Sequence, residues 1–233
     1  MNKINCVFFD LYNTLFKFYP DREETQYQAS KLINLEIEKS KFKKAILKSD
    51  QWFAEQTAKK SMHLLNDEEK KIFYCEYERK IFSYLGQNLS ESESEKIWSY
   101  VYNQKSSLRK YDDVLPCLKF LKENNFMAGI ITNIDAKGED LIKKLNLSNY
   151  ILKIITSYDA GASKPSKKIF EYALNSFNST PSECLFIGDQ IETDIIGAKN
   201  SNITPILLDR ENHNNSYKEC KVIKSLNELQ SII

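Results

Sequence analysis

The sequence lacks any apolar stretch long enough to cross a bilayer, and its first apolar run follows Lys3 and stops at Asp10. A membrane-spanning helix needs about 20 consecutive apolar residues, and a secretory signal needs an uninterrupted apolar region behind its basic start. We therefore expect neither a membrane segment nor a targeting signal. A cytoplasmic protein is the default expectation.

The sequence also lacks paired cysteines. Its five cysteines are scattered along the chain, and none forms a C-x-x-C pair. Structural zinc sites and disulfide frameworks depend on closely and regularly spaced cysteines. We expect these cysteines to be reduced and structural.

An excess of charge of one sign is missing as well. The 33 lysines and arginines face 32 acidic residues, which gives a formal net charge of +1. Such a balance supplies no broad field for nucleic acid or for an anionic membrane. An anionic partner must be a small molecule held by a local site. The sequence does not define an oligomeric state.

Short apolar runs alternate with amphipathic segments along most of the chain. The predicted strands cover 4–9, 127–132, 151–157, 184–188 and 204–208, and the predicted helices cover 114–125, 138–147, 166–177 and 192–201. This alternation is typical of an α/β fold in which helices cover both faces of a parallel sheet. Residues 222–233 predict a short strand and a closing helix, with Ser225 and Glu228 spaced as a capping box.

Glycine and proline are nearly absent from residues 17–108, which contain only Pro20 and Gly86. This stretch shows no clear strand, and its periodicity predicts four helices, at about 21–36, 38–60, 67–86 and 90–107. Asp67 and Ser90 are candidate N-caps, the second with Glu93 three residues later. The sequence thus predicts a helical insertion at 17–108 in an α/β core formed by 1–16 and 109–233.

Polar residues follow four successive predicted strands of this core. They are Asp10, the pair Thr132-Asn133, Lys164 before Pro165, the pair Gly188-Asp189, and Asp194. Ligands of open parallel sheets bind at the carboxyl ends of the strands. We therefore expect these groups to lie together at one edge of the sheet.

The three carboxylates of Asp10, Asp189 and Asp194 would repel one another without a positive charge among them. A hard divalent cation with oxygen ligands resolves this, and Mg²⁺ suits a site completed by phosphate and water. Lys164 adds a positive charge, and the hydroxyl of Thr132 and the backbone N–H of Asn133 offer donors for phosphoryl oxygens. A carboxylate beside such an electrophile can attack it and form an acyl phosphate.

These motifs resemble those of the haloacid dehalogenase (HAD) superfamily of hydrolases. The resemblance rests on D-L-Y-N-T at 10–14, Thr132-Asn133, Lys164-Pro165 and G-D-x-x-x-x-D at 188–194. The stretches "SKPSKKIFEYAL" and "FIGDQIETDIIGAKN" are also similar to its phosphatase branch. The resemblance covers 4–16 and about 112–208, and it implies a Rossmann-like core with an inserted all-helical cap domain.

The resemblance also implies residue roles. Asp10 is then the nucleophile that becomes phosphorylated, and Lys164 holds both the nucleophile and the group in transfer. The implied catalytic set is Asp10, Tyr12, Thr132 and Lys164. The implied substrate-binding set is Thr14, Thr132, Asn133 and Lys164. The implied Mg²⁺ ligands are Asp10, Asp189, the backbone carbonyl of Tyr12 and Asp194, the last either directly or through water.

Tyr12 departs from the usual pattern of the phosphatases in this superfamily. They carry an aspartate there, which protonates the leaving alkoxide and later activates water. A tyrosine, with an ordinary pKa of about 10, does this poorly at neutral pH. Loss of a positioned acid–base group typically lowers a rate by about 10² to 10⁴.

Three functions remain open on these residues. The first is a Mg²⁺-dependent phosphatase that hydrolyses small phosphomonoesters, of the sugar phosphate or nucleotide type, through an aspartyl-phosphate intermediate at a low rate. A helical cap that closes over the site would exclude large substrates.

The second is a metal-independent 2-haloacid dehalogenase, since that branch commonly has tyrosine at the position of Tyr12. Those enzymes replace the Gly-Asp pair and carry an arginine roughly thirty residues after the nucleophile. This chain keeps Gly188-Asp189 and has no arginine in residues 35–50. The third is a weakly catalytic module that binds phosphoesters.

Overall fold

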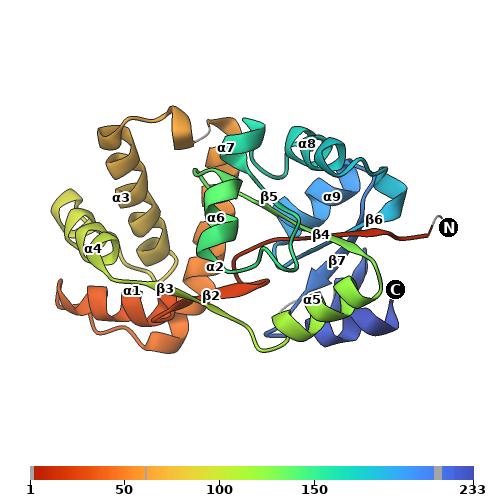
Figure 1. The fold of residues 1–233 in the computed structure, drawn as a ribbon. Coiled ribbons are helices and arrows are strands. Elements are labelled where there is room, and N and C mark those ends of the chain that lie inside the picture. Colours follow the sequence, from red (N-terminus) through yellow and green to blue (C-terminus); the bar gives the residue numbers. More distant parts are fainter. Residues whose placement is uncertain (1–2, 61, 213–216) are drawn as a thin grey trace. The chain divides into compact units, whose positions relative to one another are not determined.

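The computed structural model describes residues 3–60, 62–212 and 217–233, and the chain divides into two units (Figure 1). The core unit consists of Met1–Lys17 and Lys110–Ile233, and the helical unit consists of Phe18–Arg109.

The core unit contains a six-stranded sheet in the order β5-β4-β1-β6-β7-β8. Its neighbouring strands pair in parallel. The strands are β1 (Cys6–Phe9), β4 (Met127–Thr132), β5 (Lys153–Thr156), β6 (Cys184–Gly188), β7 (Thr204–Leu208) and β8 (Lys221–Ile223). The predicted parallel α/β core is therefore confirmed. Because β4, β1 and β6 are neighbours, their carboxyl ends lie at one edge.

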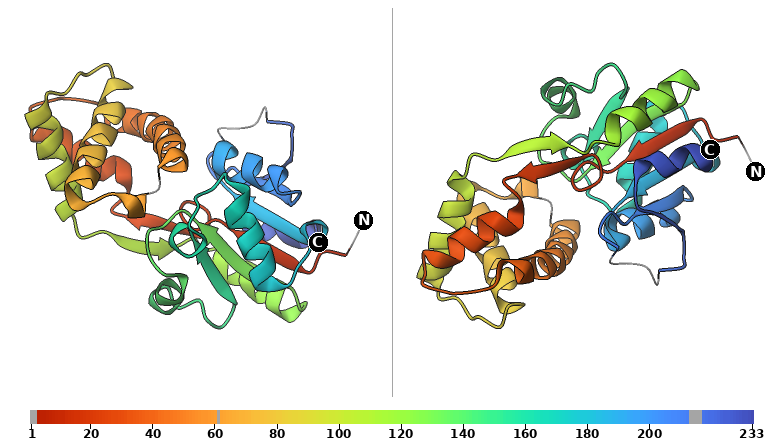
Figure 2. Two further views of the ribbon diagram at one scale, coloured as in Figure 1. Left: turned by 90° about the horizontal axis from the view of Figure 1, so that it is seen from above. Right: turned by 90° about the horizontal axis from the view of Figure 1, so that it is seen from below.

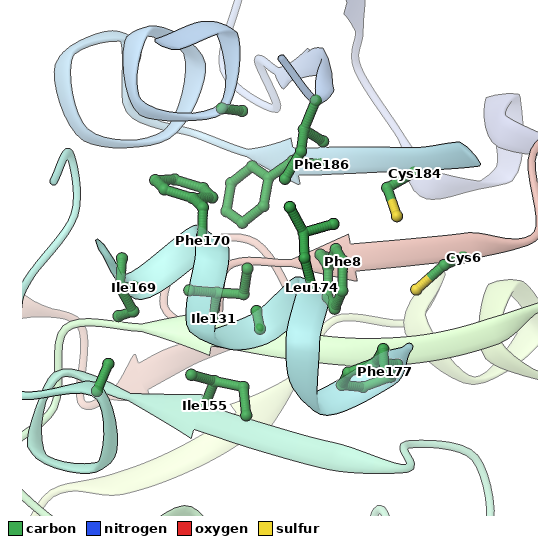
Figure 3. Packing of buried hydrophobic residues seen from close by; sticks show 14 residues of the cluster. Cys6, Phe8, Ile131, Ile155, Ile169, Phe170, Leu174, Phe177, Cys184 and Phe186 are labelled. Carbon is green, nitrogen blue, oxygen red and sulfur yellow. The ribbon is translucent and has the colours of Figure 1, made fainter. Parts of the chain in front are cut away.

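One face of the sheet packs against α8 (Lys167–Phe177) and α9 (Ile196–Asn200). Figure 3 shows the apolar side chains of α8 directed onto strand residues such as Phe8 and Phe186. The rings of Phe8 and Phe177 meet edge to face with centroids 4.9 Å apart, and those of Phe170 and Phe186 are 5.4 Å apart. This packing explains why the strands read as continuous apolar runs, since both of their faces are covered.

The other face carries α5 (Val114–Glu123), which contacts β4 and the C-terminal segment η4 (Leu226–Ser231) (Figure 1). The predicted capping box of Ser225 and Glu228 is confirmed, and β8 is the predicted short strand. The closing helix that the capping box starts is a 3₁₀ helix.

Several core elements differ in extent from the predicted ones. The helix predicted at 138–147 is α6 (Gly138–Lys144), and a short α7 (Ser157–Ala160) and a 3₁₀ turn η2 (Pro181–Glu183) were not predicted. The helix predicted at 192–201 begins as a π-helical turn, η3 (Ile191–Ile195), and continues as α9.

The helical unit has the four predicted helices, shown from two further sides in Figure 2. They are α1 (Arg22–Lys31), α2 (Lys39–Lys59), α3 (Asp67–Ser83) and α4 (Glu91–Asn103), with a short 3₁₀ helix η1 (Met62–Leu64) between α2 and α3. Ser90 caps α4 as predicted, but the N-cap of α3 is Asn66 and not Asp67. Its helices pack around a cluster of buried hydrophobic residues: Ala29, Phe42, Ala45, Ile46, Tyr77, Ile81, Phe82 and Ile97.

Two short strands lie where the chain passes between the units. β2 (Phe16–Tyr19) and β3 (Ser107–Lys110) form a two-stranded sheet of their own. The sequence had shown no clear strand in 17–108. Among the described residues, no helix combines the length and the apolar character needed to cross a membrane.

Candidate active site

Most of the predicted site residues of the core unit lie at the ends of three neighbouring strands or in the loop before α8. Asp10 directly follows β1, and its backbone N–H donates to the carbonyl of Ile187 in β6 at 2.8 Å. Thr132 is the last residue of β4, and Asp189 directly follows β6. The predicted edge of the sheet is therefore where the structure places them.

Lys164 lies between two of the carboxylates. Its Nζ is 2.6 Å from Oδ1 of Asp10 and 2.6 Å from Oδ1 of Asp194. All three side chains are nearly or fully buried. A buried ammonium ion is costly unless charge and hydrogen bonds compensate it. The two aspartates provide that compensation, and Lys164 joins two segments that are far apart in the sequence.

The side chain of Asn133 holds the backbone of Lys164. Asn133 Nδ2 donates to the carbonyl of Lys164 at 3.0 Å, and the N–H of Lys164 donates to Asn133 Oδ1 at 2.7 Å. The sequence had suggested only the backbone N–H of Asn133 as a phosphate donor. The structure adds a role for its side chain, which fixes the loop that carries Lys164.

The three carboxylates predicted to bind metal form one cluster. One oxygen from each of Asp10, Asp189 and Asp194 lies within 4.8 Å of the other two. Gly188 allows this approach, because a Cβ on it would lie 2.2 Å from Oδ2 of Asp194. The glycine of the Gly188-Asp189 pair is thus required by close packing against a carboxylate.

The π-helical turn η3 directs Asp194 back toward the strand ends. The N–H of Gln190 donates to Asp194 Oδ2 at 3.1 Å, and Thr193 Oγ1 donates to Gln190 Oε1 at 2.9 Å. Sequence reasoning missed Gln190 and Thr193. A single wide turn is compatible with the spacing from Asp189 to Asp194, but no residue type indicates a π turn in advance.

Burial dominates the electrostatics of the cluster. It raises the pKa of the Asp10 carboxyl to about 6, and the charge of Asp194 adds to this while Lys164 opposes it. Burial is the main cause that raises the pKa of Asp189 well above its ordinary value, and the negative charges of Asp10 and Asp194 add to it. For Lys164, burial lowers the pKa, but the charges of Asp10 and Asp194 outweigh it and raise the pKa.

The donor set fits a hard divalent cation. Three ionised carboxylates and one ammonium ion leave a formal charge of −2 in a largely buried space. Lys164 therefore compensates only part of the negative charge, and burial, together with the neighbouring carboxylates, raises the pKa of Asp10 and of Asp189. Clustered carboxylate oxygens are the ligands that Mg²⁺ prefers.

The remaining predicted residues lie on adjoining segments. Thr14 is fully buried, and its Oγ1 donates to Asp189 Oδ1 at 3.4 Å. Thr132 is buried and pairs with Thr156 of β5 across the sheet; in the described residues it is not part of the hydrogen-bonded group around Lys164. Tyr12 is half-buried and forms a β-bridge with Phe16, and Asn13 beside it has a φ of 59°, in the left-handed region.

Comparisons with known proteins agree with this architecture. The family model of haloacid dehalogenase-like hydrolases matches residues 4–202. A glyceraldehyde 3-phosphate phosphatase from Pyrococcus furiosus is 37% identical over 94 residues, which are 40% of this chain and 39% of that protein. The pyrimidine 5'-nucleotidase YjjG from Escherichia coli is 32% identical over 115 residues, which are 47% of this chain and 50% of that protein.

The chain thus spans half or less of the length of these two curated relatives. Among solved structures, YfnB from Bacillus subtilis, assigned to the HAD hydrolases and bound to magnesium, aligns with a TM-score of 0.68. The alignment covers 99% of both chains at 17% identity. At that identity the likeness establishes the fold.

Proposed function

Because this chain belongs to the haloacid dehalogenase-like hydrolases, we propose that it is a Mg²⁺-dependent phosphatase that acts on small phosphomonoesters through a phosphorylated Asp10. The observation that carries this proposal is the buried group in which Lys164 contacts Asp10 and Asp194 at 2.6 Å while Asp189 completes the carboxylate cluster. Relatives named for a triose phosphate and for pyrimidine nucleotides support the sugar phosphate and nucleotide classes of substrate.

Asp10, Asp189 and Asp194 would hold the Mg²⁺ ion, with the backbone carbonyl of Tyr12 as the further ligand that the family resemblance implies. When bound, the ion would offset negative charge on the phosphoryl oxygens and on the carboxylates. Thr14 would steady Asp189 through its 3.4 Å hydrogen bond.

In the first step, a carboxylate oxygen of Asp10 attacks the phosphorus atom, and the phosphorus–oxygen bond to the leaving group breaks. The leaving group departs with the bonding electrons and takes up a proton, and Asp10 is left as a mixed anhydride with phosphate. Lys164 keeps Asp10 in place, while the Thr132 hydroxyl and the Asn133 N–H would donate to the phosphoryl oxygens.

In the second step, water attacks the same phosphorus atom and releases inorganic phosphate. The Asp10 carboxylate is restored, and one proton from the water leaves the site. An aspartate at position 12 would serve both proton transfers, and Tyr12 serves them poorly. We therefore expect turnover to be slow for leaving groups that need a proton.

A metal-independent 2-haloacid dehalogenase is the second candidate, because Tyr12 fits that branch and a halide leaves without a proton. The cluster of three carboxylates opposes it, since that branch uses no metal and replaces the Gly-Asp pair that this chain keeps at Gly188-Asp189. A weakly catalytic phosphoester-binding module is the third candidate, because it needs the charged cluster but no acid at position 12.

The test is hydrolysis of an activated aryl phosphate with Mg²⁺ and with a chelator, beside halide release from a 2-haloacid. We expect Mg²⁺-dependent phosphate release that disappears in Asp10→Asn. Asp140→Asn is the matched control, because Asp140 is an exposed aspartate on α6 of the same unit.

Phosphate release that survives in Asp10→Asn would contradict the assigned nucleophile. Metal-independent halide release would favour the dehalogenase. A folded protein that binds Mg²⁺ and phosphate but releases neither product would favour the binding module.

A further inference from the structure

Arg210 lies two residues after β7 and connects three separate segments of the core unit. Its Nη1 and Nη2 donate to Oδ2 and Oδ1 of Asp113 at 2.8 and 2.9 Å, and Nη2 also donates to the carbonyl of Thr14 at 2.8 Å. Its guanidinium lies 3.9 Å from the centre of the Tyr111 ring. Arginine forms such a combination of paired hydrogen bonds and stacking, whereas lysine does not.

The carboxylate of Asp113 accepts hydrogen bonds from groups that are distant in the sequence. It is the residue before α5, where an aspartate usually accepts a hydrogen bond from its own helix, yet it makes no such cap. Its Oδ2 instead accepts from Ser225 Oγ at 2.7 Å and from the N–H of Leu226 at 2.9 Å, in addition to Arg210. The ion pair of Arg210 and Asp113 therefore also fixes the start of the C-terminal segment η4.

Thr14 links Arg210 to the acidic cluster. Its carbonyl accepts from Arg210, and its hydroxyl donates to Asp189 at 3.4 Å. A displacement of the Thr14 backbone would therefore move the hydroxyl that contacts a predicted metal ligand. Residues that orient metal ligands through a hydrogen bond typically change metal affinity or activity by about 10- to 100-fold when they are replaced.

Arg210 also contacts both places where the chain passes between the units. Thr14 lies three residues before the chain leaves the core unit after Lys17, and Tyr111 and Asp113 follow its return at Lys110. The N–H of Tyr111 donates to the carbonyl of Leu15 at 3.1 Å, so the two segments are also joined directly.

We propose that Arg210 is a positioning residue that holds the Thr14 segment and the Tyr111–Asp113 segment in place and thereby orients Asp189 for Mg²⁺. The part that concerns Mg²⁺ rests on the function proposed above. Arg210 touches neither the substrate nor the metal in this role, and it acts through Thr14.

The sign of the effect on Mg²⁺ separates this role from simple electrostatics. Removing a positive charge from the neighbourhood of an acidic cluster would by Coulomb's law tighten Mg²⁺ binding. Loss of positioning would weaken it. A weaker affinity in Arg210→Met is therefore opposite to what the change of charge alone predicts.

The first measurement is hydrogen exchange of the metal-free protein, because it requires neither activity nor metal. In Arg210→Met we expect amides in residues 11–16 and 111–114 to exchange about tenfold faster or more, relative to amides of β6. Arg210→Lys keeps the charge but cannot hold Asp113 with two bonds and Thr14 with a third, so we expect the same change to a smaller extent. Arg210→Lys also provides the test if Arg210→Met does not fold.

The control is Arg22→Met in the helical unit. Arg22 forms a comparable pair with Asp50, with two bonds of 2.8 Å, and we expect its loss to leave exchange of 11–16 and 111–114 unchanged relative to β6. Exchange like that of the wild type in both Arg210 variants would overturn the proposal.

The second measurement is the Mg²⁺ dissociation constant by calorimetry. We expect it to rise about 10-fold or more in Arg210→Met and to stay unchanged in Arg22→Met. Faster exchange with unchanged or tighter Mg²⁺ binding would overturn the link from Arg210 to the site. A wild type that binds no Mg²⁺ would contradict the proposed metal dependence, and the exchange rates would then decide the role of Arg210 alone.

Discussion

Replacing Gly188 by alanine tests the geometry of the carboxylate cluster with a single methyl group. A Cβ at this position would lie 2.2 Å from Oδ2, 2.4 Å from Cγ and 2.6 Å from Cβ of Asp194. Since even the Cβ of Asp194 is too close, rotation of the carboxylate alone cannot relieve the overlap. The whole side chain has to withdraw.

The size of the effect follows from these distances. Ordinary contacts between carbon atoms begin at about 3.5 Å, so Asp194 must move by about 1 Å or more. Its 2.6 Å contact with Lys164 would then exceed hydrogen-bonding distance. Breaking a buried ion pair costs about 3–5 kcal/mol, and we expect about 3 kcal/mol here, because Lys164 keeps Asp10 as a partner.

The assay is urea-induced unfolding of the wild type and Gly188→Ala without metal, followed by Mg²⁺ titration of both. We expect the free energy of unfolding to fall by about 3 kcal/mol and the Mg²⁺ affinity to fall by about tenfold or more. Gly86→Ala is the control. Nothing lies within 4 Å of its added Cβ, so only the strain of its φ of +78° is expected, at about 1–2 kcal/mol, with no effect on Mg²⁺.

A Gly188→Ala protein with the stability and Mg²⁺ affinity of the wild type would refute this reasoning, because Asp194 could not then pack against Gly188 as described. If the variant fails to fold, Asp194→Asn keeps the volume and removes the charge. A normal Mg²⁺ affinity in that second variant would refute the role of Asp194 as a ligand.

Two further predictions concern Tyr12 and the helical unit. Tyr12→Asp should raise the hydrolysis rate of alkyl phosphates by about 10²-fold or more if a missing acid limits it; steady-state rates check this, and a fall would give Tyr12 a positive role. Burial raises the pKa of Glu78 from 4.5 to about 7 against the opposing Gln26 hydrogen bond. The folded state therefore binds the proton more tightly, and the stability lost as pH rises from about 4.5 to about 7 is about 3 kcal/mol. Urea unfolding across this pH range should show a smaller loss of stability in Glu78→Gln than in the wild type. Equal pH profiles of the two proteins would contradict this prediction.

The sequence was sufficient to predict the parts that depend on local patterns. Apolar runs covered on both faces identify strands, and a polar residue after such a run identifies the edge at which ligands bind. Asp10, Thr132 and Asp189 were placed in this way, and the structure has each at the end of its strand. These predictions needed no knowledge of the pairing order of the strands.

The parts of the fold and the site that could not be predicted depend on contacts between residues distant in the sequence, or on differences in preference between neighbouring residues that are too small to decide. β2 and β3 are four residues each and stabilise one another, so neither has a pattern of its own. Asn66 and Asp67 are both good N-caps, and the choice between them depends on one residue of register. Arg210 and Asp113 are 97 positions apart, and each reads as an ordinary surface charge.

The helical unit contains another feature that the sequence does not predict, the burial of Glu78. Glu78 lies in a helix rich in charged residues, and its charge gives no sign that it is buried while Glu76 and Lys80 are only half-buried. The structure buries it to 3% exposure with the side chain of Gln26 donating to it at 2.7 Å. A buried carboxylate of this kind is determined by which face of α3 meets α1, and charge patterns do not determine that face.

The arrangement around Lys164 also bears on the proton that the leaving group needs. Lys164 is the cation closest to Asp10 among the contacts described above, but it shares its protons with two carboxylates at 2.6 Å each. Burial lowers its pKa, but those carboxylates outweigh burial and raise it, so Lys164 retains its proton at neutral pH. Because Tyr12 is also a weak acid, a leaving group that is stable as an anion places the smallest demand on this site. An activated aryl phosphate is therefore the substrate with which the proposed attack by Asp10 can be tested apart from proton transfer.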